Sequence, residues 1–167
     1  MLNTRIAVPG EEDVIAFLGK GFEDKVQPYC LNPTQVRAYL NEWVVATDEA
    51  NNIMGSFHFV SQSPDNLERN LNYLYYMKQV PLPVIFNWLT HDAIFTGQPI
   101  CPGKGSLRAC FNYMSHLTGE VWSVLSVVSS VSAFYQEQLG FKVTGQYTFM
   151  NTLKGGVSTF NILRWKK

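Results

Sequence analysis

The segment from residue 99 to residue 106 is rich in glycine and proline and reads Pro-Ile-Cys-Pro-Gly-Lys-Gly-Ser. It lies between a predicted strand and a predicted helix, where backbone N–H groups and a helix dipole can hold a phosphate. The alternative is a tight turn that simply leads into the helix. A P-loop is excluded, because five residues rather than four separate Gly97 from Gly103 and Gly105 follows Lys104. A dinucleotide-binding fingerprint is also excluded, because it needs a glycine where Arg108 stands.

A second motif lies further along the chain, from Ala133 to Lys142. It reads Ala-Phe-Tyr-Gln-Glu-Gln-Leu-Gly-Phe-Lys, with Gly145 just beyond, and resembles the A..FYEKLGFK..G signature of the GNAT family of N-acetyltransferases. The glycine-rich segment is similar to the loop of that family, which typically reads PEYRGKGVGRAL where this chain has residues 99–110. The resemblance spans nearly the whole chain and is strongest over residues 134–141. It implies the GNAT fold, a central mixed β-sheet flanked by helices, in the α/β class.

The resemblance also implies an activity and roles for particular residues. The activity is transfer of an acetyl group from acetyl-CoA to a primary amine of an unknown acceptor by direct attack. Backbone groups would bind the pantetheine arm and steady the carbonyl oxygen (Ile94, Phe95 and Thr96), and the loop would bind the pyrophosphate (Gly103, Lys104, Gly105, Ser106 and Leu107). Tyr135 stands where many members carry a tyrosine near the CoA sulfur, and a phenol, with a pKa of about 10, can protonate a leaving thiolate. The base for the amine is expected at His91 or Asp92, of which at most one faces the site because neighbours on a strand point to opposite faces.

Departures from the family pattern keep a second function open. The family loop has the form [Gln/Arg]-x-x-Gly-x-[Gly/Ala], whereas Pro102 and Leu107 occupy its outer positions here. Pro102 lacks a backbone N–H, and Leu107 is expected to add bulk where the pyrophosphate would approach. Residues 128–130, Val-Ser-Ser, replace an asparagine that is often found there. These changes favour a catalytically inactive GNAT-like domain used for ligand or protein binding, whereas residues 103–105 and Tyr135 favour the enzyme.

The hydrophobic pattern predicts elements that would position these residues. Strands are expected at residues 4–8, 42–47, 53–61, 85–96, 121–128, 141–149 and 157–165. Helices are expected to end near residue 22, to begin at residues 32–33, and to cover residues 63–77, 106–117 and 132–139. The early hairpin predicts antiparallel pairing, and the later alternation of strands and helices predicts parallel pairing, so the sheet is mixed. The tyrosines of the segment 63–77 either cover an acceptor pocket or belong to an extra helix on the sheet or at a homodimer contact.

Composition limits the remaining function classes. The 167 residues are 46% hydrophobic, 14% aromatic and only 16% charged, which excludes a disordered chain and predicts a single domain over residues 1–167. Thirteen basic residues balance thirteen acidic ones, so no overall charge attracts nucleic acid or an anionic membrane. No metal is expected, and His58 and His116 are expected to be ordinary because neither has a companion at ligand spacing.

Neither membrane insertion nor secretion is indicated. The two long uncharged stretches, residues 79–91 and 121–136, are shorter than the roughly 20 apolar residues of a membrane-spanning helix. The first residues lack a hydrophobic signal core. The cysteines are odd in number and follow no metal-ligand or CxxC spacing (Cys30, Cys101 and Cys110). We therefore expect reduced cysteines and a cytoplasmic location.

Overall fold

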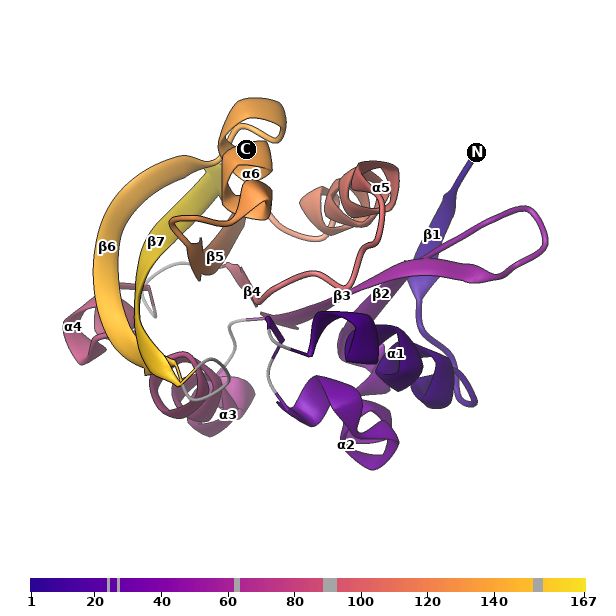
Figure 1. Cartoon of the computed structure of the whole chain (residues 1–167), viewed down its shortest axis with the longest axis horizontal. Helices are drawn as coiled ribbons and strands as arrows, with labels where there is room; N and C mark the ends of the chain where they lie inside the picture. The colour runs from indigo at the N-terminus through magenta and orange to yellow at the C-terminus, as the bar shows by residue number, and fades with distance from the viewer. Residues whose placement is uncertain (24, 27, 62–63, 89–92, 152–154) are drawn as a thin grey trace. The chain divides into compact units, whose positions relative to one another are not determined.

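The computed structural model describes the chain apart from residues 24, 27, 62–63, 89–92 and 152–154 (Figure 1). The residues group into two compact units. Unit 1 consists of residues 1–59 and 97–117, and unit 2 consists of residues 60–96 and 118–167. The single domain predicted from the length stays a prediction. None of the helices formed by the described residues combines the length and the apolar character needed to cross a bilayer.

Unit 1 is built on three antiparallel strands. They lie in the order β1 (Asn3–Ile6), β2 (Trp43–Thr47) and β3, which starts in this unit and runs from Ile53 to Ser61. The helices are α1 (Glu12–Gly19), α2 (Pro33–Ala38) and α5 (Lys104–Ser115), with short 3₁₀ turns η1 (Lys20–Phe22), η2 (Pro28–Leu31) and η3 (Leu40–Glu42). Within this unit, α1 and α2 cover one face of the strands and α5 covers the other (Figure 1). All five residues of β2 are consequently buried.

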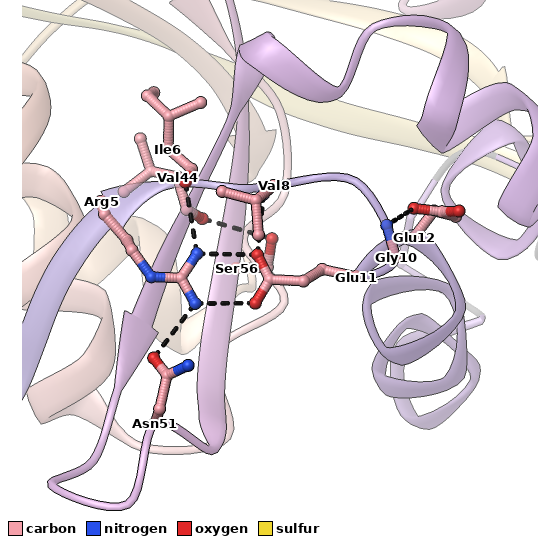
Figure 2. Close-up of polar contacts among 9 residues, drawn as sticks. All are labelled: Arg5, Ile6, Val8, Gly10, Glu11, Glu12, Val44, Asn51 and Ser56. Atoms are coloured by element: carbon pink, nitrogen blue, oxygen red, sulfur yellow. Dashed lines mark hydrogen bonds and ion pairs between the residues drawn. The ribbon is translucent and has the colours of Figure 1, made fainter.

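A polar network anchors the start of α1 to the strands (Figure 2). Arg5 on β1 donates two hydrogen bonds of 2.7 Å to the carboxylate of Glu11 and a third of 3.1 Å to Asn51 in the β2–β3 turn. The backbone N–H of Val8 donates to the same carboxylate at 2.8 Å. The hydrogen bonds from Arg5 hold the pKa of Glu11 below its ordinary value. Asn51 itself has a positive φ of 63°, which asparagine tolerates better than most residues.

Unit 2 contains the mixed part of the fold. Its strands lie in the order β4 (Ile94–Thr96), β5 (Glu120–Ser126), β7 (Gly156–Lys166) and β6 (Lys142–Asn151). The pair β4–β5 is parallel, whereas β5–β7 and β6–β7 are antiparallel, so the predicted mixed sheet is confirmed. Helix α6 (Ser130–Gln138) packs against β5; Ser129 caps its start, and Gly140, with a φ of +81°, follows its end.

The connection before β4 differs from the sequence prediction. A helix, α4 (Leu82–Trp88), occupies the first part of the strand expected over residues 85–96, and β4 covers only its last three residues. Ile85 and Trp88 are buried while Phe86 between them is exposed, and this spacing of three residues is that of a helix face rather than of a strand. The expected helix over residues 63–77 is divided into η4 (Pro64–Asn66), α3 (Leu67–Leu71) and a π-helical turn, η5 (Asn72–Met77).

Candidate functional site

The amino end of α5 in unit 1 has the features of an anion site. Gly103 precedes the helix in extended conformation, and its carbonyl accepts hydrogen bonds from the N–H groups of Ser106 and Leu107 at 3.2 and 3.3 Å. The Ser106 hydroxyl donates to the same carbonyl at 2.7 Å. A Cβ placed on Gly103 or on Gly105 would meet nothing within 4 Å, so the space beside both residues is open. The positive end of a twelve-residue helix is therefore accessible through two glycines.

Two of the five predicted loop residues are oriented differently from the other three. Ser106 and Leu107 are only 5% and 3% exposed, whereas Gly103, Lys104 and Gly105 are exposed. Leu107 was expected to add bulk where the pyrophosphate would approach, but its side chain belongs to the buried face of α5. That face continues at helical spacing with Cys110, Phe111 and Met114. One of the departures from the family loop is thus a core residue.

Close packing against β3 fixes the first turn of α5. Gly55 on β3 pairs with Ala46 on β2, so two small residues face the helix. A Cβ on Gly55 would lie 2.8 Å from the Ser106 Oγ and 2.9 Å from the Ser106 Cβ. Only glycine permits this approach. Sequence reasoning missed Gly55, although a glycine inside a strand is a recognised sign of close backbone approach.

The predicted pantetheine-binding residues lie on the parallel pair β4–β5 of unit 2. Ile94, Phe95 and Thr96 are in register with Val121, Trp122 and Ser123, and all three are buried. The Thr96 hydroxyl donates to the Trp122 carbonyl at 3.2 Å, and the Ser123 hydroxyl donates to the Thr96 carbonyl at 3.3 Å. Strand β4 ends at Thr96, whereas β5 continues to Ser126. The last residues of β5 therefore extend beyond the end of β4.

Tyr135, the predicted acid, belongs to the buried face of α6 in unit 2. Its side chain is 1% exposed, and its ring lies 4.7 Å from that of Phe141. Its backbone carbonyl accepts hydrogen bonds from the N–H groups of Leu139 and Phe141, which fixes the turn that ends the helix. The hydroxyl is buried as well.

The structure leaves other predicted roles open and adds one polar cluster. His91 and Asp92, the predicted bases, lie outside the described residues. Among the residues that are described, no group of three His, Cys, Asp or Glu side chains is arranged to hold a metal ion. His58, expected to be ordinary, makes hydrogen bonds through both ring nitrogens, to Tyr29 and to Glu42. Its two partners are distant in sequence, so no local spacing signalled the cluster.

Solved structures of GNAT acetyltransferases are similar to this chain over nearly its whole length. A GNAT-family acetyltransferase from Bacillus cereus is 16% identical with a TM-score of 0.64, covering 100% of this chain and 98% of its own. A ribosomal-protein-alanine N-acetyltransferase from Brucella melitensis is 11% identical with a TM-score of 0.67, covering 99% of each chain. The yncA protein of Salmonella typhimurium, solved with its cofactor acetyl-CoA, is 12% identical with a TM-score of 0.67, covering 99% of this chain and 94% of its own. No protein-family model and no curated protein matches the sequence. The chain has the fold of the GNAT N-acetyltransferases, as the motif around Tyr135 predicted.

Proposed function

We propose that the chain is an N-acetyltransferase that uses acetyl-CoA to acetylate a primary amine. One observation carries the proposal: a GNAT fold in which the helix expected to bind the pyrophosphate begins with two open glycines, Gly103 and Gly105. The presence of acetyl-CoA in the similar yncA structure supports this choice of cofactor. The burial of Leu107 removes one of the reasons for expecting an inactive domain.

In unit 1, the amino end of α5 would hold the pyrophosphate. The N–H groups of Gly103, Lys104 and Gly105 are the proposed donors, because those of Ser106 and Leu107 already donate to the Gly103 carbonyl. The N–H groups of Ser106 and Leu107 would still contribute through the helix dipole, whose positive end attracts an anion. The Lys104 side chain adds a positive charge at the same end of the helix.

In unit 2, the pair β4–β5 would bind the pantetheine arm, whose amide groups can pair with an extended backbone as an added strand does. The proposed backbone contacts are those of residues 94–96, together with the part of β5 that extends past Ser123. Side-chain hydrogen bonds between Thr96 and β5 keep the two strands in fixed register there.

Acetyl-CoA supplies an activated acetyl group as a thioester, and the protein residues position the reactants and move protons. Tyr135 is the proposed acid, with a phenolic proton on Oη that can be donated to a leaving thiolate. Fixed backbone donors directed at a developing oxyanion contribute up to about 3–4 kcal/mol in enzymes of known mechanism. Residues 94–96 are proposed to supply such a donor.

Acetyl transfer can be tested without knowing the acceptor. The purified chain is incubated with acetyl-CoA and, separately, with a peptide bearing an N-terminal alanine, a lysine peptide, a polyamine and an arylalkyl amine. Release of the CoA thiol and the mass of each amine are followed together. We expect at least one amine to gain an acetyl group at a rate that depends on the protein, with an equal amount of free CoA. Binding of acetyl-CoA without acetylation of any amine would instead favour a ligand-binding domain.

A further inference from the structure

Two of the three cysteines lie together at the start of α5, within unit 1. Cys101 precedes the first turn of the helix, and Cys110 lies on its second turn. Both are free thiols, and the Cys110 thiol is hydrogen-bonded to Cys101. Two thiols in direct contact are the reactants of a disulfide bond. The pair is therefore a candidate site of oxidative modification.

Packing against β3 places the Cys101 sulfur beside the helix. The residue before Cys101 forms a bridge with Ser56 on β3, and the Cys101 Sγ atom is 3.6 Å from the Ser56 carbonyl oxygen. A Cβ on Gly55 would lie 3.1 Å from the same sulfur and 2.8 Å from the Ser106 Oγ. The side chains of Cys101 and Ser106 thus share the space beside this glycine. Cys110 follows Ser106 by one helical turn on the same buried face of α5, so the packing brings the two cysteines together.

The hydrogen bonds distinguish the two thiols. Cys101 donates its hydrogen to the Ser56 carbonyl, so its sulfur is left to accept the hydrogen of Cys110. This hydrogen bond and burial raise the pKa of the Cys110 thiol well above its ordinary value. Cys110 is 0% exposed, whereas Cys101 is half-buried. Cys101 is therefore the more accessible thiol of the pair, and Cys110 is held in contact with it from the interior.

A disulfide between the two cysteines would change the geometry at the amino end of α5. The sulfur atoms must approach each other to about 2.0 Å, which is much closer than a hydrogen bond allows. Two backbone hydrogen bonds of 2.9 Å fix the residue before Cys101 to Ser56, so Cys101 has little freedom to move. The first two turns of α5 must therefore shift toward Cys101. Gly103 and Lys104 lie between the two cysteines, and their N–H groups, which are proposed to bind the pyrophosphate, would be displaced by this shift.

We propose that Cys101 and Cys110 form a reversible disulfide that weakens acetyl-CoA binding at the amino end of α5, a role that rests on the proposed function. The oxidant is a peroxide. It oxidises one thiol to a sulfenic acid, while its O–O bond breaks and it is reduced to water. The sulfur of the second thiol then bonds to the first sulfur, and the thiol proton leaves with the hydroxyl group as a second water. A dithiol reductant restores both thiols by thiol–disulfide exchange.

Peptide mapping tests the disulfide without acetyl-CoA. In the Cys30→Ala variant the pair are the only cysteines left, because the sequence has three. Trypsin separates them by cutting after Lys104 and Arg108. The folded variant, treated briefly with hydrogen peroxide, is expected to become a monomer lighter by two hydrogen atoms in which the Cys101 and Cys110 peptides are joined. Dithiothreitol is expected to separate them, and the wild type is expected to give the same joined peptides.

A second variant traps the intermediate. In Cys30→Ala with Cys110→Ala, the sulfenic acid formed on Cys101 has no partner in the chain, so dimedone is expected to label it. Two results of peroxide treatment of the Cys30→Ala variant would overturn the proposal. One is a disulfide between two copies of the chain, and the other is oxidation of Cys101 to a sulfinic acid while Cys110 stays a free thiol.

Titration with acetyl-CoA tests the consequence for binding. The oxidised Cys30→Ala variant is expected to bind at least about tenfold more weakly than the reduced variant, which is the cost of losing one hydrogen bond to a charged group. Cys101→Ser in the same background is the matched control, and peroxide is expected to leave its affinity unchanged. Equal affinity of the oxidised and reduced Cys30→Ala variant overturns the regulatory role while leaving the proposed function intact. Reduced wild type that binds no acetyl-CoA overturns the proposed function itself, and with it this role of the disulfide.

Discussion

Replacing Gly55 by alanine tests whether its lack of a side chain sets the position of the α5 amino end. The new Cβ would lie 2.9 Å from the Ser106 Cβ, a contact that rotation of Ser106 cannot relieve. It would also lie 2.8 Å from the Ser106 Oγ, which is held by its 2.7 Å hydrogen bond to Gly103. The first turn of α5 must therefore move away from β3, and the N–H groups proposed to bind the pyrophosphate move with it.

The size of the effect follows from two opposing contributions. Overpacking a well-filled interior costs about 1–3 kcal/mol. Replacing glycine by alanine returns about 0.4–1 kcal/mol by restricting the unfolded chain. The midpoints of these two ranges give a net loss of stability of about 1.3 kcal/mol, or a fall in Tm of about 3–5 °C for a chain of this length. Affinity for acetyl-CoA is expected to fall as well.

Thermal unfolding and acetyl-CoA titration measure both effects, with Gly21→Ala as the control. A Cβ on Gly21 meets nothing within 4 Å and its φ is ordinary, so this variant is expected to be as stable as the wild type or slightly more stable. Ser106→Gly is expected to cost less in the Gly55→Ala background than alone, because it removes the clashing atoms. Equal stability and affinity of the two alanine variants would refute the packing argument.

Three further predictions concern the described residues. Glu11→Gln is expected to destabilise the chain at pH 7. The hydrogen bonds from Arg5 lower the folded-state pKa of Glu11, so the ionised carboxylate stabilises the folded wild type. This contribution is complete above about pH 4.3, the ordinary pKa of a glutamate, and is lost as the pH falls through the lowered folded-state pKa. Denaturant unfolding at several pH values should therefore show the two proteins converging in acid, and a constant difference would contradict the ion pair. Hydrogen bonding to Cys101 and burial raise the pKa of the Cys110 thiol, so an alkylating reagent is expected to modify the half-buried Cys101 before Cys110 in the folded protein. Peptide mapping measures the two rates of modification, and equal rates would contradict this expectation. Ser129→Ala is expected to cost about 1 kcal/mol by removing the α6 cap, as judged by thermal unfolding; no loss would mean that the Val131 N–H finds another acceptor.

Short motifs with local causes were predictable from the sequence. The residues around Tyr135 indicated the GNAT fold, and Asn32 followed by Pro33 indicated the start of α2, where the Asn32 side chain accepts from the N–H of Thr34. The parallel pair β4–β5 followed from the alternation of strands and helices. In each case the signal lies within a few neighbouring residues or in the order of elements.

Features that depend on distant contacts were not predictable from the sequence. The apolar residues from Ile85 to Trp88 are compatible with a strand or with a helix. The structure distinguishes the two, because Ile85 and Trp88 are both buried, as residues on one face of the helix α4 are. Gly55 is constrained to be glycine by its close contact with Ser106. His58 is hydrogen-bonded to Tyr29 and to Glu42, which come from other parts of the sequence. These partners are separated by 16 to 51 residues, so a local sequence pattern cannot indicate their contacts.

Binding of acetyl-CoA to Gly105 variants tests the central claim most directly. An aspartate at the second position of α5 suits the helix dipole but repels a phosphate, whereas asparagine has nearly the same shape and no charge. At 100 times its Kd, acetyl-CoA should stabilise the wild type by about 2.7 kcal/mol, or about 5–10 °C in Tm. We predict that Gly105→Asp folds as stably as Gly105→Asn but loses this shift, while the asparagine variant keeps most of it. No shift in the wild type, or equal shifts in the two variants, would contradict the claim that the amino end of α5 binds the cofactor.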